Sequence, residues 1–184
     1  MNNQDRRFKK TENSIQKALI SLLQKGDLSS IGFQDVIEEA DINKSTFYLH
    51  YSSLSDAFAA LENKCLATIF QVLNGEESSP KDIFEQLLQA ILDDKKLYLA
   101  VMTSCTNSFM DKLTNVALPL LGEKEANLRN AKYESSVAKT QGLVVGVYSI
   151  FRYWILSGCR APKEKVEGDA LDFLAKYQSD FSKR

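Results

Sequence analysis

The chain has 184 residues, of which 44% are hydrophobic and 26% charged, a balance typical of a folded globular protein and unlike that of a disordered or fibrous one. It has no run of 18 apolar residues, and its polar N-terminus lacks the apolar segment of a secretory signal, so we expect no membrane span and a cytoplasmic location. The net charge of −1 excludes a strongly basic protein, although charge can still gather locally.

Metal and redox chemistry find little support in the sequence. The cysteines, Cys65, Cys105 and Cys159, lie far apart and lack metal-ligand spacing. Buried reduced thiols and a redox-sensing thiol are the two interpretations, and the spacing favours the first. His50 is the only histidine, so it cannot belong to a His-based metal cluster. We expect no metal site and no cofactor.

A basic cluster opens the chain, ahead of the first predicted helix. It could contact DNA phosphates, or it could be a solvated, disordered terminus. Thr11 is a candidate N-cap for a long helix that Gly26 ends. The cluster consists of Arg6, Arg7, Lys9 and Lys10.

Two short helices follow, and a tight turn separates them. Apolar residues over 33–40 fall at i, i+3, i+4 and i+7, the spacing of one helix face. Asn43 is a good N-cap for a second helix over residues 44–51. Since only Asp41, Ile42 and this cap separate the two, the spacing predicts a helix-turn-helix.

The helix over 44–51 has a docking face, made by Phe47, His50 and Tyr51, and a presented face. The rules of groove recognition place Lys44, Ser45 and Thr46 at base edges and Leu49 at a thymine methyl group. They place Tyr48, His50 and the basic cluster at phosphates. For His50 a packed, hydrogen-bonded side chain is the alternative.

Residues 11–61 resemble the N-terminal domain of the TetR family of transcription regulators. The family commonly has a turn Gly where Asp41 stands, and Asp tolerates a positive φ better than most residues do. It usually has a phosphate-contacting Lys where Leu54 stands, so we expect one missing contact and weaker non-specific binding. The resemblance is carried by Thr11, Ile15, Ala18, Leu22, Phe33, Val36, Ile37, Ala40, Ile42, Thr46, Phe47, Tyr48, His50 and Tyr51.

The remaining sequence predicts further helices. Ser53 and Asp56 form a capping signature for a helix that runs to about Leu73, and Ser79-Pro80 opens the next. Helical pieces are expected over 96–103 and 108–118, followed by a polar connection over 123–132. The apolar run 142–156 and a last helix from Pro162 resemble the family's closing pair of helices, which form a four-helix bundle with their symmetry mates.

These patterns predict an all-α fold of about nine helices. A three-helix, DNA-binding helix-turn-helix domain is expected over residues 1–52, and a helical effector-binding and dimerisation domain over 53–184. A homodimer would present two recognition helices to a palindromic operator. Gly142 and Gly146 either admit a partner helix or relieve crowding inside one subunit. The residues expected at the dimer interface are Gly142, Val145, Gly146, Ser149, Tyr153, Leu174 and Tyr177.

The resemblance also implies a pocket for a small-molecule effector of unknown class. Aromatic and soft side chains of the second domain are candidates to line it, and each is a simple core residue in the alternative interpretation. The candidates are Tyr98, Met102, Cys105, Phe109, Tyr133, Tyr148, Phe151 and Trp154.

The sequence therefore predicts a transcriptional regulator, a ligand-responsive repressor that binds double-stranded DNA as a homodimer. The alternative is a helical interaction protein of the same fold that has lost sequence-specific DNA binding, and Leu54 is its best support. An enzyme is disfavoured, because the chain has one histidine, no glycine-rich phosphate loop and no nucleophile elbow. The acidic pairs Glu38-Glu39 and Asp93-Asp94 are most simply solvated helix faces.

Overall fold

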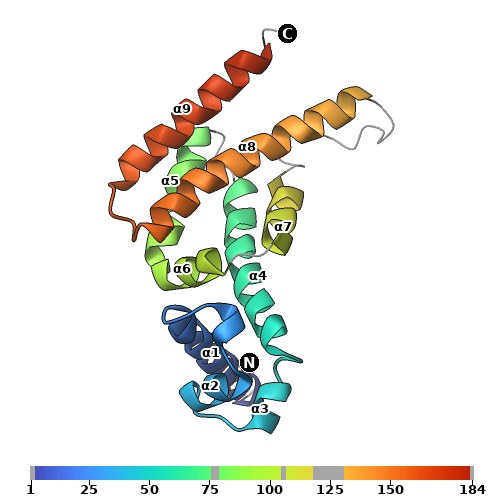
Figure 1. Ribbon diagram of the computed structural model, residues 1–184, viewed down its shortest axis with the longest axis vertical. Helices are drawn as coiled ribbons and strands as arrows, with labels where there is room; N and C mark the ends of the chain where they lie inside the picture. Colours follow the sequence, from blue (N-terminus) through green and yellow to red (C-terminus); the bar gives the residue numbers. More distant parts are fainter. Residues whose placement is uncertain (1–2, 76–78, 105–106, 118–130, 183–184) are drawn as a thin grey trace. The chain divides into compact units, whose positions relative to one another are not determined.

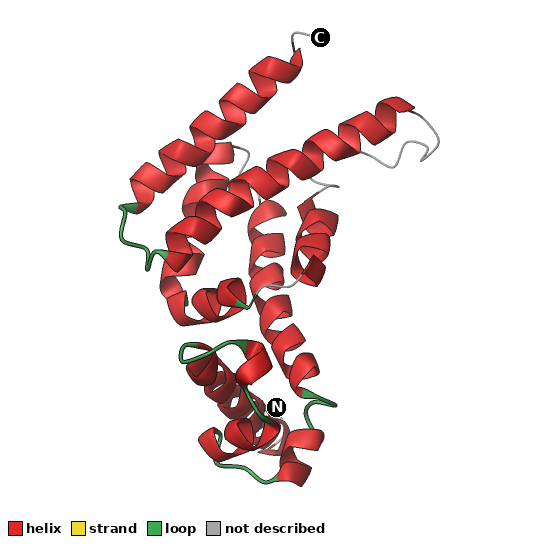
Figure 2. Ribbon diagram, in the orientation of Figure 1, coloured by secondary structure: helices red, strands yellow, loops and turns green. Residues whose placement is uncertain are grey.

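The computed structural model describes residues 3–75, 79–104, 107–117 and 131–182, and every regular element within them is helical (Figures 1 and 2). The predicted all-α fold of about nine helices is confirmed. In order, the elements are α1 (Asn3–Leu23), the short 3-10 helix η1 (Leu28–Ser30), α2 (Phe33–Glu39), α3 (Lys44–Tyr48), α4 (Leu54–Leu73), α5 (Pro80–Asp93), α6 (Lys95–Thr103), α7 (Asn107–Ala117), α8 (Ala131–Leu156) and α9 (Lys163–Ser182). No helix of these described segments is both long and apolar enough to span a membrane.

The helices pack into two compact units. Unit 1 comprises Met1–Cys65 and Lys96–Cys105, and unit 2 comprises Leu66–Lys95 and Thr106–Arg184. The first unit thus holds α1, α2, α3, the first part of α4 and nearly all of α6. This division describes packing, so the functional boundary between residues 52 and 53 stays a prediction.

The core of unit 1 is built from the apolar faces of its helices. Ile15 and Leu19 of α1, Val36 of α2 and Phe47 of α3 are fully buried. Removing each such side chain from water stabilises the fold by about 1.5–3 kcal/mol, so this shared core holds the short helices α2 and α3 in place.

The start of α1 differs from the prediction. The helix begins at Asn3, and Thr11 is not its N-cap, because the Thr11 hydroxyl donates to the backbone carbonyl of Arg7 at 3.1 Å. A threonine inside a helix can satisfy its hydroxyl in this way, one turn back. The basic cluster therefore forms the first turns of a helix.

The turn between α2 and α3 agrees with the prediction for Asp41, which has φ +52°. The Ile42 N–H donates to the Ile37 carbonyl at 3.0 Å, and the Asp41 N–H donates to Glu38 at 3.1 Å. These two bonds are a Schellman motif, in which the residue after the helix adopts a left-handed conformation. Asp41 thus ends α2 where glycine is the more usual residue.

α3 is shorter than predicted, since it ends at Tyr48 and not at residue 51. The Leu49 N–H is shared between the carbonyls of Ser45 and Thr46, so the last turn tightens and the helix stops. Its start agrees with the prediction, because the Asn43 side-chain oxygen accepts the Thr46 N–H at 2.8 Å.

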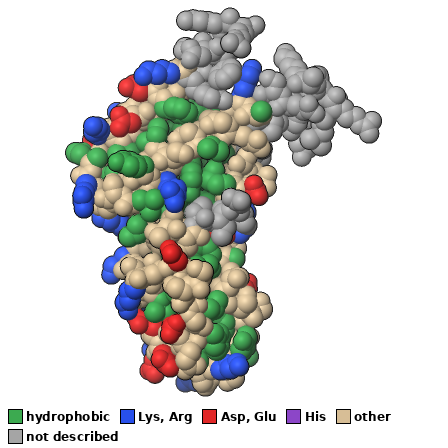
Figure 3. Space-filling model, viewed as in Figure 1, with side chains coloured by type: hydrophobic (Ala, Val, Ile, Leu, Met, Phe, Trp, Pro, Cys, Tyr) green, Lys and Arg blue, Asp and Glu red, His purple; other side chains and the backbone are tan. Residues whose placement is uncertain are grey.

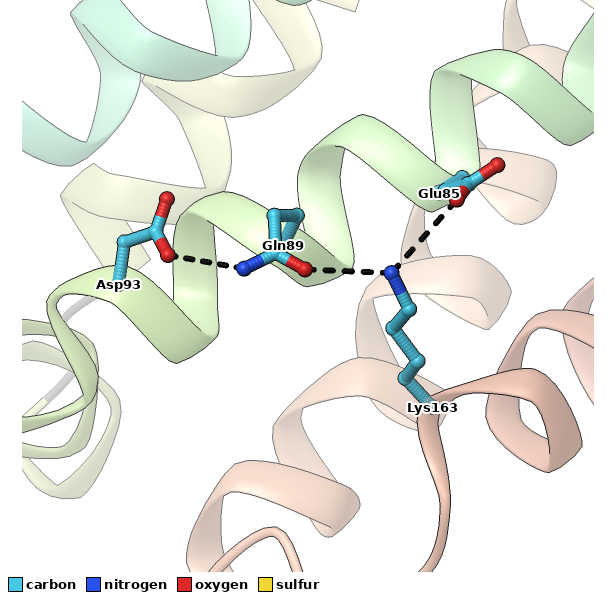
Figure 4. Close-up of polar contacts among 4 residues, drawn as sticks. All are labelled: Glu85, Gln89, Asp93 and Lys163. Atoms are coloured by element: carbon cyan, nitrogen blue, oxygen red, sulfur yellow. Dashed lines mark hydrogen bonds and ion pairs between the residues drawn. The ribbon is translucent and has the colours of Figure 1, made fainter.

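In unit 2, α9 packs beside both α5 and α8 (Figure 1). Phe84 of α5 meets Phe151 of α8 edge to face, with the ring centroids 5.7 Å apart. At the start of α9, Lys163 donates to Gln89 at 3.1 Å and lies 3.6 Å from Glu85 (Figure 4). Because an exposed ion pair contributes at most about 1 kcal/mol, these polar contacts set the register of α9 more than its stability.

The length of α8 also differs from the prediction. The helix begins at Ala131, so residues 131 and 132 of the predicted polar connection are helical, and residues 123–130 lie outside the described residues. The last helix begins at Lys163, one residue after Pro162.

Gly146 lets α8 and α9 come together within one chain. A Cβ built on Gly146 would lie 2.2 Å from Cζ of Phe173, far inside contact distance. Of the two interpretations of this glycine, relief of crowding inside one subunit therefore applies.

We predict that Gly146→Ala destabilises the protein by about 1–3 kcal/mol, because the added methyl group must displace the Phe173 ring. Gly168→Ala is the matched control: this α9 glycine has open space around its Cβ position, and alanine there stabilises by up to about 1 kcal/mol. Urea unfolding at one fixed protein concentration measures both. Equal stability of the two variants would contradict the described packing.

Candidate nucleic-acid interface

α3 presents a row of solvent-exposed side chains from unit 1. Lys44 and Ser45 are exposed, as are Tyr48 at 51% and Leu49 at 74%. Thr46 is half-buried. On the opposite side the Phe47 ring is fully buried. The predicted presented side is therefore open to a ligand, while the helix is anchored through its other side.

The cap of α3 also sets the chemistry of Ser45. Its hydroxyl donates to the same Asn43 oxygen that caps the helix, at 2.7 Å. Because the Ser45 hydroxyl already donates its hydrogen to Asn43, only its oxygen lone pairs remain available. Ser45 can therefore accept a hydrogen bond from a ligand. Exposed amino groups of adenine and cytosine in the major groove are donors of the matching kind.

His50 lies partly beneath Phe8 of α1, with the ring centroids 3.9 Å apart. Its Nδ1 is buried and has no hydrogen-bond partner among the described residues. Burial lowers the pKa of His50, and the charge of Glu12 opposes that shift. His50 is therefore packed, although its Nδ1 lacks the hydrogen bond that the packed interpretation included, and a neutral ring brings no positive charge to a phosphate.

Tyr51 ties the end of the α3 segment to α1. Its phenol oxygen accepts a hydrogen bond from the side-chain amide of Gln16 at 3.0 Å. Burial, more than any neighbouring charge, raises the pKa of Tyr51, so the phenol stays neutral. This contact fixes the position of the chain just after the end of α3.

The basic cluster lies exposed on the first turns of α1. A cation in the first turn of a helix is unfavourable by about 0.3–1 kcal/mol, and only Arg6 of this cluster lies in that turn, since α1 begins at Asn3. In the described part of the chain we find no ion pair for Arg6, Arg7, Lys9 or Lys10 that would offset this cost. These four exposed charges are therefore accessible to an external anion.

Two aromatic residues that the sequence analysis did not assign to this surface help to shape it. Phe8 covers His50, and Phe33 of α2 stacks on Tyr48 with centroids 5.3 Å apart. Phe33 had been predicted as part of an apolar helix face and as one of the residues that carry the family resemblance, without a role at this surface. Its position directly after the α2 N-cap, close to the α3 segment in sequence, was the available signal.

The candidate effector residues are divided between the two units. Tyr98 and Met102 belong to unit 1, whereas Phe109, Tyr148, Phe151 and Trp154 belong to unit 2. All but the half-buried Tyr148 are buried. The Trp154 indole N–H donates to the Ala161 carbonyl at 2.9 Å, which gives it a role within its own chain. Cys105 and the side chain of Tyr133 lie outside the described residues.

A narrow stripe along α8 is exposed, and it contains four of the residues expected at a dimer interface. Gly142, Val145, Ser149 and Tyr153 lie on this side of the helix, and the exposed Leu156, which was not predicted, continues it. Figure 3 shows apolar side chains gathered where α8 and α9 lie. Gly146 faces Phe173 of its own chain, and Leu174 is half-buried. The side chain of Tyr177 lies outside the described residues.

Solved structures share this fold. A TetR transcriptional regulator from Streptococcus agalactiae 2603V is 24% identical, with 96% of each chain covered and a TM-score of 0.66. The dihydroxyacetone kinase operon activator DhaS is 19% identical over 91% of this chain and 96% of its own, with a TM-score of 0.60. A transcriptional regulator of the TerR/AcrR family from Aquifex aeolicus VF5 is 15% identical over 90% and 98%, with a TM-score of 0.62.

No family model and no curated protein matches the chain. At these low identities the likeness to solved structures establishes a shared fold. The fold is the one found in TetR-family transcriptional regulators, as the sequence resemblance had indicated.

We predict that the single histidine titrates below pH 6.5 in the folded protein and near 6.5 in the urea-unfolded chain, because burial disfavours its charged form. The unfolded state then binds more protons, so His50 makes the fold less stable as the pH falls through 6.5. Phe8→Ala uncovers the ring and moves the midpoint upward. Proton NMR of the imidazole measures each midpoint, with Phe70→Ala as the control. If Phe8→Ala left the titration midpoint of His50 unchanged, Phe8 would not be the residue that shields the imidazole from water.

Proposed function

We propose that the chain, which has the fold of TetR-family regulators, is a transcriptional regulator that inserts α3 into the major groove of duplex DNA. The observation that carries this proposal is the division of α3 into an anchored side at Phe47 and an exposed side with Lys44, Ser45, Tyr48 and Leu49. A helix that crosses the backbone and a second that enters the groove is the geometry of a helix-turn-helix. Here α2 and α3 take those places.

The exposed groups suit the two kinds of contact that such an interface needs. Lys44, Ser45 and the less exposed Thr46 are assigned to base edges, and Leu49 to a thymine methyl group. Tyr48 and the basic cluster are assigned to phosphates, which position the protein without reading sequence. His50 enters only as a neutral donor, since its pKa is lowered by burial. Because these cations are local, a net charge of −1 does not oppose DNA binding.

We propose a homodimer, because one α3 reaches only a few base pairs. A two-fold pair presents two copies to half-sites about one helical turn apart or somewhat further, on a palindromic operator. The exposed stripe of α8 supports this assignment, since Val145, Tyr153 and Leu156 leave apolar surface uncovered in a single chain.

We also propose that a small molecule controls this binding and that the protein is a repressor. Control requires the effector to bind more tightly to one of two conformations, and a 100-fold preference corresponds to about 2.7 kcal/mol. One solved structure of this fold is named an operon activator, so a promoter-reporter assay must decide the sign of regulation.

The alternative is a helical interaction protein without sequence-specific DNA binding. Leu54, half-buried at the first position of α4, supports it because no cation stands there. Selection from random double-stranded DNA at low salt discriminates between the two. Enrichment of an inverted repeat supports the regulator, and no enrichment supports the interaction protein.

We predict that Tyr48→Ala and Lys44→Ala each weaken binding to the selected operator by about 5- to 100-fold, the range for one lost contact. Fluorescence anisotropy across a salt series measures the effect. Phe70→Ala is the control for the tyrosine, since Phe70 has a similar exposure of 52% in unit 2, and Lys81→Ala is the control for the lysine. If the α3 variants bound as tightly as these controls, α3 would not be the DNA-binding element.

We predict that Val145→Asp converts the dimer to monomer, because a desolvated, unpaired carboxylate is costly at an apolar interface. Val145 is 45% exposed in the single chain, and Leu92→Asp, at a site on α5 with 38% exposure, is the matched control. Sedimentation velocity measures the assembly, and circular dichroism checks that both variants fold. If the Val145→Asp protein dimerised as tightly as the parent, α8 would not form the dimer interface.

A further inference from the structure

Three aromatic rings lead from the core of unit 1 to the exposed side of α3. The Phe33 ring contacts the buried Phe47 edge to face, with centroids 4.9 Å apart and an interplanar angle of 83°. Phe33 also stacks on the exposed Tyr48, with centroids 5.3 Å apart and an angle of only 16°. Phe47 and Tyr48 meet edge to face at 5.7 Å. The outermost ring is therefore held against two others.

Lys44 adds a charge to this cluster. Its Nζ lies 5.9 Å from the centroid of Phe33 and 6.0 Å from that of Tyr48, at the outer limit of a cation-π interaction. Lys44 and Tyr48 are four residues apart, so they lie on the same face of α3. One α2 side chain, Phe33, thus touches the phenol ring and faces the ammonium group.

Free lysine and tyrosine side chains on a surface sample several rotamers, and a ligand that fixes them must overcome that entropy. Ordering one such side chain in an interface therefore lowers the affinity. A stacked Tyr48 and a Lys44 held over the rings have lost part of this freedom before any ligand arrives. Side chains ordered in advance raise affinity without a new contact.

We propose that Phe33 is a positioning residue of the DNA interface, which orients Tyr48 and Lys44 for the operator without touching DNA itself. This inference rests on the proposed function. Phe33 is half-buried in α2, and neither the groove-recognition rules nor the predicted presented face of α3 includes it. The order within α3 then depends on a residue from the neighbouring helix.

The first test needs no DNA. In the parent protein the side-chain methylene protons of Lys44 experience the ring currents of Phe33 and Tyr48, so they resonate upfield of those of the exposed Lys81. Phe33→Leu keeps an apolar side chain but removes one of the two rings and the support of the other, so the Lys44 signals are expected to move toward the Lys81 position. Phe33→Tyr keeps the ring and the shift. Lys44 signals that match Lys81 in the parent would overturn the positioning, whether or not an operator exists.

The second test is a double-mutant cycle with the selected operator. Phe33→Leu is expected to weaken binding by about 3- to 10-fold in the parent, and to have no effect when Lys44→Ala and Tyr48→Ala are already present. Phe33→Tyr restores the affinity. Val36→Ala, at a fully buried position of the same helix, is the structural control and weakens binding equally in both backgrounds.

The outcomes separate the two proposals. If no DNA sequence is enriched, the proposed function fails, while the NMR comparison still decides the orientation of Lys44. The inference is overturned if the operator binds and Phe33→Leu weakens that binding by the same factor in the parent and in the Lys44→Ala, Tyr48→Ala protein, as Val36→Ala does. Phe33 would then serve only the fold.

Discussion

Burial of the Phe47 ring is the interaction on which the candidate interface depends. α3 has only five residues, and a helix that short has no stability of its own in water. Burying a phenylalanine stabilises by about 1.5–3 kcal/mol, and the Asn43 cap contributes about 1 kcal/mol more. Both act on the same short segment. These two contacts fix the backbone of α3, and with it the side from which its exposed groups project.

The backbone turn before α3 decides which side of the helix can be buried. Asp41 adopts a left-handed conformation and Ile42 donates back to α2, so α2 ends and the chain turns within a few residues. A longer or looser connection would let α3 rotate about its own axis. Rotation would carry Phe47 out of the core and bring Lys44 and Tyr48 toward it. The turn at Asp41 therefore determines that Lys44 and Tyr48, and not Phe47, face the solvent.

The surroundings of α3 differ in their electrostatic character. On α1, four exposed cations gather along the first turns of the helix, where an external anion can reach them, although only Arg6 lies in the first turn itself. Beside them, Phe8 covers His50 and holds the only histidine in its neutral form. Positive charge at this surface thus comes from lysine and arginine side chains and not from His50. A separate constraint applies in unit 2, where the absence of a side chain at Gly146 allows the Phe173 ring to approach α8 closely.

The sequence by itself determined the helical pattern, the caps at Asn43 and Ser53, and the turn at Asp41, because short-range periodicity and local hydrogen bonds govern all three. It also separated the buried Phe47 from the exposed Tyr48 and Leu49, since neighbours along a helix point in different directions. Only the tertiary structure decided the early start of α1, the Phe8 cover on His50, the stack of Phe33 on Tyr48 and the contact of Gly146 with Phe173. Apart from the early start of α1, each of these joins residues that are not neighbours on one helix, and no periodicity within one helix can tell which neighbour a side chain will meet.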